Sequence, residues 1–138
     1  MALDQSITRI FQPDPLTCPP ATPVREAARR MVLARRGAIL VGEPGRPLGI
    51  WTEHDALTLD LADPAALDQP IERVMSAPLK TIPHHATVGE AGVLFRLERV
   101  RHLVVVDDSG RAIGLIGQSE VVLRHGVEHF LMLHVVRT

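Results

Sequence analysis

The stretch Gly49-Ile50-Trp51-Thr52-Glu53-His54-Asp55 has a counterpart in Gly114-Leu115-Ile116-Gly117-Gln118-Ser119-Glu120. Each stretch follows an apolar run and a turn that contains glycine, and nearly half of the 138 residues separate the two copies. Thr17 and Thr81 are separated by almost the same interval. A period this long predicts two copies of one small module rather than a single continuous fold.

Composition supports a small globular chain with an aliphatic core. Of the 138 residues 46% are apolar, but only three Phe and one Trp supply aromatic rings. Fifteen basic and sixteen acidic residues give no global field, so we expect no nucleic-acid or membrane partner. No apolar run approaches the roughly 20 residues that span a bilayer, and no signal peptide is expected. The single cysteine, Cys18, excludes an internal disulfide framework and favours a reducing, cytoplasmic location.

The first half predicts the order strand, helix, strand, strand, helix. After a proline-rich extended entry, Thr22 is expected to cap a helix with Pro23 in its first position. This helix is predicted to reach about Arg36, where Gly37 ends it. Two strands, residues 38–41 and 48–51, flank a turn at 43–46, and a second helix is predicted from Thr52 to about residue 61.

The second half repeats this order. A short helix at 71–76 connects the halves, and Thr87 with Glu90 forms a capping-box signature at the start of the next helix. The predicted elements are a helix to about residue 99, strands at 103–107 and 112–116, and a last helix from about 118 to 134. We expect two domains, residues 1–66 with the N-terminal extension and residues 67–138 with the linker and C-terminal helix.

These motifs together resemble a tandem pair of cystathionine-β-synthase-type (CBS) domains, the Bateman module. The matching stretches are Thr17-Cys18-Pro19, Gly49 to Asp55, Val74-Met75-Ser76, Thr81-Ile82-Pro83 and Leu103 to Asp107, within residues 8–124. The resemblance implies an α/β (α+β) fold of two β-α-β-β-α repeats, packed pseudo-symmetrically through their small sheets. It also implies a regulatory module that binds an adenosyl ligand between the repeats and forms a disc-like homodimer.

The chemistry of Thr52 and Asp55 fits such a ligand. Gly49 would let a ligand approach the backbone, and a hydroxyl at the start of a helix is suited to a phosphate. Asp55, one turn on, would accept hydrogen bonds from a ribose diol. The alternative is that Thr52 and Asp55 are a capping box and only start a helix.

The second repeat departs from this pattern, because Gly117 replaces the hydroxyl residue and Glu120 replaces the aspartate. We therefore expect one good site per chain. The resemblance gives Arg101 and His102 the role of phosphate contacts; the alternative is that both cap a helix or lie in solvent. The full candidate set for ligand binding, with no catalytic residue and no metal ligand, is Thr17, Cys18, Ala38, Gly49, Thr52, Asp55, Arg101, His102 and Glu120.

Other features favour ordinary structural roles. The string His125 to His129 matches an inverted zinc-peptidase motif, but nothing else resembles those enzymes. His84-His85 is expected in an exposed loop, Cys18 at the cleft mouth, and Trp51 at a helix or dimer surface. The arginines of the first helix are expected to form a solvated face or a patch for an acidic partner. These residues are Arg25, Arg29, Arg30, Arg35 and Arg36.

The leading hypothesis is thus a regulatory CBS pair that binds AMP, ADP, ATP or S-adenosylmethionine and signals to an attached or separate effector domain. The alternative is a structural dimerisation module with vestigial ligand sites. No enzyme activity is expected, because no nucleophile with a base and no metal triad is present. The apolar residues beyond position 120 suggest a helix that either transmits a signal to a following domain or folds back on its own module.

Overall fold

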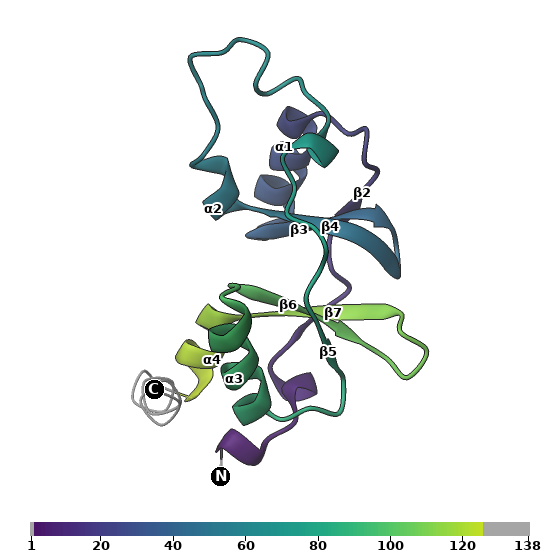
Figure 1. The fold of residues 1–138 in the computed structure, drawn as a ribbon, viewed down its shortest axis with the longest axis vertical. Coiled ribbons are helices and arrows are strands. Elements are labelled where there is room, and N and C mark those ends of the chain that lie inside the picture. Colours follow the sequence, from purple (N-terminus) through teal and green to yellow (C-terminus); the bar gives the residue numbers. More distant parts are fainter. Residues whose placement is uncertain (1, 126–138) are drawn as a thin grey trace. The chain divides into compact units, whose positions relative to one another are not determined.

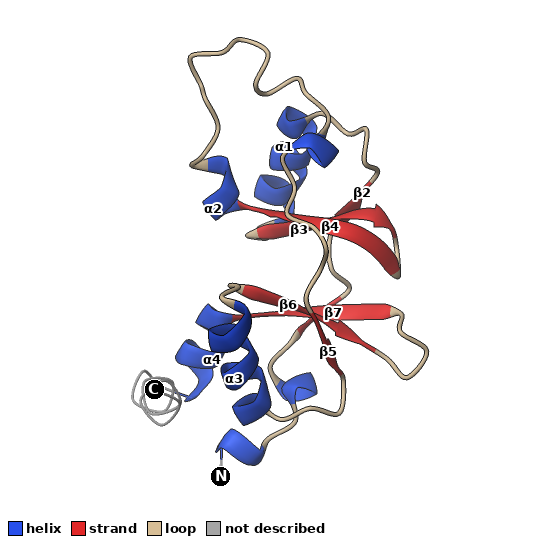
Figure 2. Cartoon of the chain, in the orientation of Figure 1, coloured by secondary structure: helices blue, strands red, loops and turns tan. Residues whose placement is uncertain are grey.

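The computed structural model describes residues 2–125, which form two compact units (Figure 1). One unit is residues 15–79, and the other joins the residues up to 14 with those from 80 onward. In each unit the helices cover one face of a small sheet (Figure 2). The predicted mixed α/β architecture of two similar repeats is confirmed.

The unit of residues 15–79 contains a three-stranded sheet in the order β2-β3-β4. Strand β2 runs parallel to β3, and β3 and β4 form an antiparallel hairpin. The elements are β2 (Thr17–Cys18), α1 (Val24–Ala34), β3 (Ala38–Glu43), β4 (Arg46–Thr52), α2 (Glu53–Ala56) and a 3-10 turn (Ile71–Arg73).

The other unit has a four-stranded sheet in the order β1-β7-β6-β5. Here β5 is parallel to β6, while β7 is antiparallel to both β6 and β1. The elements are 3-10 turns (Ala2–Asp4 and Ile7–Arg9), β1 (Gln12–Pro13), β5 (Thr81–Pro83), α3 (Val88–Glu98), β6 (His102–Val106), β7 (Ala112–Gly117) and α4 (Gln118–His125). The β-α-β-β-α order therefore occurs twice, as predicted.

Each unit has its own core, which is aliphatic around a single large ring. Trp51 is 1% exposed in the first unit, and Phe95 is 1% exposed in the second. Mainly isoleucine, valine and alanine fill the rest, with Met31 and Cys18 in the first core and Leu103 in the second. Full burial of a valine, leucine or isoleucine side chain stabilises a fold by about 1.5–3 kcal/mol. Trp51 packs against residues of α1, one of its two predicted positions, but it is buried in the core and does not lie at a surface.

The start of α1 differs from the prediction. Pro23 is extended (φ −60°, ψ 143°) and occupies the N-cap, so the helix begins at Val24 and Thr22 is not its cap. The free amides of the first turn are satisfied from elsewhere in the chain. Those of Val24 and Arg25 donate to the carbonyls of Gln69 and Leu67, at 3.0 and 2.8 Å. The loop that precedes the connecting turn therefore caps α1, which no local pattern reveals.

The ends of the two long helices use arginine where the sequence favoured glycine. Arg35 takes the left-handed conformation (φ 55°) at the end of α1, and Arg99 does so (φ 54°) after α3. Gly37 lies beyond this cap. A Cβ at Gly37 would lie 2.9 Å from Oε1 of Glu53, so this glycine makes room for a carboxylate instead.

Helix α2 ends at Ala56 rather than near residue 61. The chain beyond it turns because aspartate side chains accept from nearby amides: Asp60 from Ala62 at 3.0 Å and Asp63 from Ala65 at 2.9 Å. Such local bonds compete with helix continuation. In the second unit α4 is described to His125, and the predicted extension to 134 lies outside the described residues.

The N-terminal segment packs on the second repeat, not on the first as the expected boundary at 66 implied. Its Ile7 is completely buried in the second core, and the Ile7 amide donates to the Ala86 carbonyl at 3.0 Å. Gln12 then pairs with Leu115 at the edge of the sheet. The N-terminal segment joins the second repeat because β1 pairs with the edge of β7 that would otherwise be unpaired.

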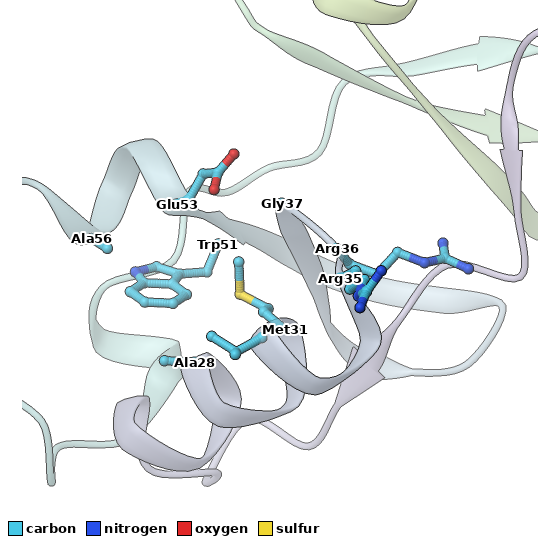
Figure 3. Close-up of a pocket in the computed structure, with 9 residues that line it drawn as sticks. Ala28, Met31, Arg35, Arg36, Gly37, Trp51, Glu53 and Ala56 are labelled. Carbon is cyan, nitrogen blue, oxygen red and sulfur yellow. The ribbon is translucent and has the colours of Figure 1, made fainter.

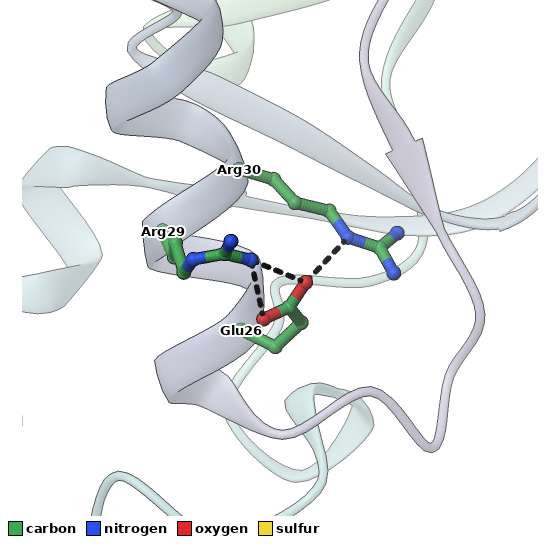
Figure 4. Close-up of polar contacts among 3 residues, drawn as sticks. All are labelled: Glu26, Arg29 and Arg30. Carbon is green, nitrogen blue, oxygen red and sulfur yellow. Dashed lines mark hydrogen bonds and ion pairs between the residues drawn. The ribbon is translucent and has the colours of Figure 1, made fainter.

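Arg25, Arg29 and Arg35 are exposed and Arg30 is half-buried, which agrees with the predicted solvated face. Arg36 does not follow it, because it is half-buried and its Nη1 is buried. Glu26 accepts from both Arg29 and Arg30 at 3.3 Å (Figure 4), and Arg25 pairs with Asp68 at 3.4 Å. Exposed pairs of this kind contribute about 1 kcal/mol or less each. Within residues 2–125, no helix is long and apolar enough to cross a bilayer.

Candidate functional site

Thr52 and Asp55 meet where β4 passes into α2. The Thr52 amide donates to Oδ2 of Asp55 at 2.9 Å, and the Asp55 amide donates to the Thr52 hydroxyl oxygen at 3.2 Å. The hydroxyl also donates to Oδ2 at 3.1 Å. Thr52 is 8% exposed, so its hydroxyl is largely withdrawn from water. The two residues therefore form a complete capping box, the structural alternative that their spacing left open.

The capping box still leaves part of Asp55 available. Both hydrogen bonds to its carboxylate end on Oδ2, so Oδ1 makes none to the described residues. The Thr52 hydroxyl proton, in contrast, is committed to Asp55. Helix α2 has only four residues, so it lacks the length for the helix-dipole contribution expected at this point.

The neighbouring candidates lie on the same small sheet. Ala38 pairs with Thr52 across β3 and β4. Thr17 pairs with Leu40, and Cys18 with Val41, across β2 and β3. The fold thus gathers Thr17, Cys18, Ala38, Gly49, Thr52 and Asp55 in the unit of residues 15–79, with Thr52 and Asp55 as the pair in direct contact.

Gly49 has a different role from the one predicted. A Cβ on it would lie 2.6 Å from the Met75 sulfur and 2.8 Å from the Ser76 carbonyl oxygen. Ser76 also exchanges two backbone hydrogen bonds with Ile50, at 2.8 and 3.0 Å. The space above Gly49 is therefore filled by the linker, which explains the glycine without a ligand.

Cys18 is a core residue rather than one at a cleft mouth. It is 2% exposed and packs among the residues of the first core. Burial raises the pKa of its thiol, outweighing a hydrogen bond to Thr22 and the charge of Arg30, which both lower it. The thiol therefore stays protonated near neutral pH and is a poor nucleophile.

The second repeat holds a reduced version of the same arrangement. The Gly117 amide donates to Oε1 of Glu120 at 3.0 Å, matching the bond from Thr52 to Asp55, but no hydroxyl completes the box. His102 pairs with Gly117 across β6 and β7, and its ring would lie 3.4 Å from a Cβ there. Arg101 is exposed, and its carbonyl accepts from the Gln118 amide at 2.9 Å. Arg101, His102 and Glu120 are thus together, in the other unit from Thr52.

The histidine motifs add no site to the described part of the chain. His84 Nε2 lies 3.0 Å from an Asp108 carboxylate oxygen in a surface contact. Among residues 2–125 there is no cluster of three or more His, Cys, Asp or Glu side chains that could bind a metal ion. The string His125 to His129 falls almost wholly outside the described residues.

One feature escaped the sequence analysis. A cavity of about 420 Å³ lies between α1 and α2, with Trp51 in its wall (Figure 3). No periodic or motif signal marks it, because it depends on how a helix end, a strand end and the short α2 converge. The only sequence hint was a bulky Trp51 where similar motifs carry small aliphatic residues.

Comparisons with known proteins agree with this architecture. An uncharacterized protein of Methanopyrus kandleri is 29% identical over 119 residues, covering 85% of this chain and 61% of that protein. The inosine-5'-monophosphate dehydrogenase of Aquifex aeolicus is 32% identical over 113 residues, covering 80% of this chain and 22% of the dehydrogenase. The chain therefore spans less than two thirds of either relative.

Among solved structures, the CBS domain protein PAE2072 from Pyrobaculum aerophilum complexed with AMP has the same fold. It superposes with a TM-score of 0.76 and 24% identity, covering 94% of this chain and 98% of that one. The CBS domain family model matches this sequence twice, at residues 7–61 and 71–124. With both repeats matched, the chain belongs to the CBS domain family, as a tandem pair.

Proposed function

We propose that this chain is a regulatory module that binds an adenine nucleotide (AMP, ADP or ATP) or S-adenosylmethionine through Thr52 and Asp55. The observation that carries the proposal is the pair itself, at the end of the β3–β4 hairpin. The Thr52 hydroxyl is largely shielded from water, and it lies beside an Asp55 carboxylate whose Oδ1 makes no hydrogen bond to the described residues. The AMP complex of a protein with the same fold supports the choice of an adenosyl ligand.

The contacts suggest a division of roles. A ribose diol offers two donors, and Oδ1 of Asp55 can accept one without disturbing the capping box. The Thr52 hydroxyl can donate to a ligand phosphate only after it rotates away from Asp55. The hydrogen bond from the Thr52 amide to Oδ2 would still hold the carboxylate in place. Thr17 and Ala38 would border the ligand from the neighbouring strands, whereas Cys18 lies in the core. Arg101, His102 and Glu120 would form a second, weaker set.

The output of the module would reach an effector. Both relatives named above are longer than this chain, so we propose that the ligand signal passes to an attached or a separate domain. We further propose that the module acts in the cytoplasm. The module itself would regulate and not catalyse.

A structural role is the second candidate, in which both ligand sites are vestigial and the module only dimerises. The observation that favours it is the loss of the hydroxyl at Gly117. The titrations below separate the two candidates.

We expect Thr52→Ala and Asp55→Ala each to weaken AMP binding by about 1–3 kcal/mol, because each removes one hydrogen bond to a charged ligand. Isothermal titration of both variants against AMP measures the loss. Thr52→Ser, which keeps the hydroxyl, should retain most of the affinity.

A matched control separates lost binding from a lost helix cap. Thr87 and Glu90 form a second capping box, with bonds of 3.1–3.3 Å, at the exposed start of α3. Thr87→Ala should cost about 1 kcal/mol of stability and leave AMP affinity unchanged. Equal affinity in all of these variants would refute the assignment of Thr52 and Asp55.

We expect one nucleotide per chain. Gly117 lacks a hydroxyl, and Glu120 already accepts the Gly117 amide. The stoichiometry of the AMP titration checks this expectation, with protein concentration fixed by amino-acid analysis. Two equal sites per chain would contradict it.

We also expect a homodimer. Large apolar side chains are exposed along the helical side of the first unit, with Val32 76%, Leu33 70% and Leu57 82% exposed. Exposed apolar surface of this kind favours association. Sedimentation equilibrium should give twice the monomer mass at micromolar concentration, and Leu57→Glu should shift the mass toward that of the monomer. A wild-type monomer under these conditions would contradict the expectation.

A further inference from the structure

A second cavity, of about 540 Å³, lies at the end of the three-stranded sheet where β3 turns into β4. Its walls come from the loop after β2 and from the β3–β4 hairpin, and the residues of α1 and α2 do not line it. Leu48, in its wall, and Thr52 are four positions apart on β4, which in a strand is about 13 Å. The cavity therefore lies apart from the helical face expected in the dimer and from the residues proposed for the nucleotide.

The wall of this cavity is apolar and rigid. Its apolar groups come mainly from Leu48, which is 58% exposed, and from three prolines, Pro19, Pro20 and Pro44. A proline side chain has no rotamer freedom to lose, so an apolar group that packs against it orders little of the protein. The volume is within the range of small-molecule sites, about 300–1,000 Å³. The cavity is therefore suited to the apolar part of a small molecule.

Two opposite charges lie side by side in the wall of the same cavity. Glu43 and Arg46 are partners across the hairpin, and both are exposed. Directly opposed residues of an antiparallel pair have Cβ atoms about 4.5–5.5 Å apart. Neither side chain makes an ion pair or a hydrogen bond to another residue within 2–125. An exposed ion pair between them would contribute little stability, so a ligand could bind both groups at once.

The second hairpin satisfies its own charges and offers a comparison. Asp107 takes the place of Glu43, because each lies just beyond the register shift in its strand. An Asp107 carboxylate oxygen accepts from the Ser109 hydroxyl at 2.7 Å and from the Arg111 amide at 3.0 Å. The carboxylate of the first hairpin has no such partner among the described residues. This difference between the repeats indicates that Glu43 is available to a ligand.

We propose that this cavity binds a free amino acid with a large apolar side chain, such as phenylalanine. The Arg46 guanidinium would hold the α-carboxylate, and the Glu43 carboxylate would accept from the α-ammonium group. An amino acid carries these two charges on one carbon, and the hairpin places the complementary charges opposite each other. The apolar side chain would pack against Leu48 and the prolines. Because this site is separate from Thr52 and Asp55, the module would respond to two different small molecules.

Titration of the ¹⁵N-labelled chain with L-phenylalanine tests the proposal. The amide signals of Gly42 and Leu48 should move saturably, while that of Gly110, on the second hairpin, should stay in place. Two analogues each lack one charge: 3-phenylpropanoate has no ammonium group, and phenethylamine has no carboxylate. Each should bind about tenfold more weakly than phenylalanine. Glycine, which has no apolar side chain, should give no saturable shift over the same concentration range.

Charge variants assign each contact. Glu43→Gln should weaken phenylalanine binding about tenfold without weakening 3-phenylpropanoate, which has no group for this carboxylate. Arg46→Gln should likewise weaken phenylalanine about tenfold without weakening phenethylamine. Both residues are exposed, so the fold should persist in each variant. Arg111→Gln, at the corresponding place on the second hairpin, is the matched control and should change none of these affinities.

The proposal is overturned if phenylalanine gives no saturable shift, or if either analogue binds the wild-type chain as tightly as phenylalanine does. It is also overturned if Glu43→Gln and Arg46→Gln both bind phenylalanine with wild-type affinity. Thr52→Ala and Asp55→Ala should not alter the phenylalanine titration. Amino-acid binding and nucleotide binding can therefore fail independently of each other.

Discussion

Deleting residues 1–13 is expected to unfold much of the second repeat, although these residues precede the first. The deletion removes Ile7 and Ile10, 0% and 5% exposed, from that core, and it removes β1 from the edge of β7. Loss of each large buried side chain costs about 2–5 kcal/mol, comparable to the whole stability of a small domain. Amide signals of α3, β6 and β7 should collapse in a ¹H–¹⁵N spectrum.

A graded variant keeps this expectation testable if the deletion yields no soluble protein. Ile7→Ala should lower the free energy of unfolding by about 2–5 kcal/mol in urea melts. Thr8→Ala, in the same 3-10 turn but exposed, is the control and should change stability by less than about 0.5 kcal/mol. A deletion variant with native signals throughout α3 would show that the segment is dispensable.

Replacing Gly114 by valine is expected to be the most damaging single substitution in the second sheet. A Cβ there would overlap the Phe11 ring and lie 2.9 Å from the Gln12 carbonyl oxygen, so β1 must leave its place on β7. The loss should be about 3 kcal/mol, at the upper end of what overpacking usually costs. Urea denaturation measures it.

Gly117→Ala is the matched control on the same strand. Its new Cβ would lie 3.4 Å or more from its neighbours, an ordinary contact, so stability should change by less than about 1 kcal/mol. Equal losses in the two variants would mean that strand propensity, not the crossing of β1, explains Gly114.

The sequence predicted the repeat because its signals are local. Apolar strands, a glycine turn between them and the Thr87–Glu90 capping box involve residues a few positions apart, and all three were found. Thr52 and Asp55 were likewise predicted to act as a pair: their spacing allowed a capping box, and the CBS resemblance added the ligand-binding interpretation. Their geometry as a capping box, with one open oxygen on Asp55, required the structure.

Where the sequence failed, a distant segment supplied the missing partner. The carbonyls of Leu67 and Gln69 accept from the first amides of α1. They therefore do the work that the sequence had assigned to Thr22 as the N-cap. The sequence predicted that Gly49 admits a ligand and that Gly114 marks the second repeat. In the structure each glycine leaves room for a segment that crosses its strand: Met75-Ser76 at Gly49, and Phe11-Gln12 at Gly114. These contacts join residues that no periodicity connects.

The sequence by itself thus determined the family, the two β-α-β-β-α repeats and the aliphatic core. The repeat interval, the pattern of apolar residues and the residues of the turns can all be recognised in short segments of the sequence. Only the tertiary structure decided which repeat the N-terminal segment completes, why the two glycines are required, and that Trp51 and Arg36 meet one cavity. These features depend on contacts between segments that are far apart in sequence. Because protein interiors are closely packed, the position of one segment limits which side chain fits on the other.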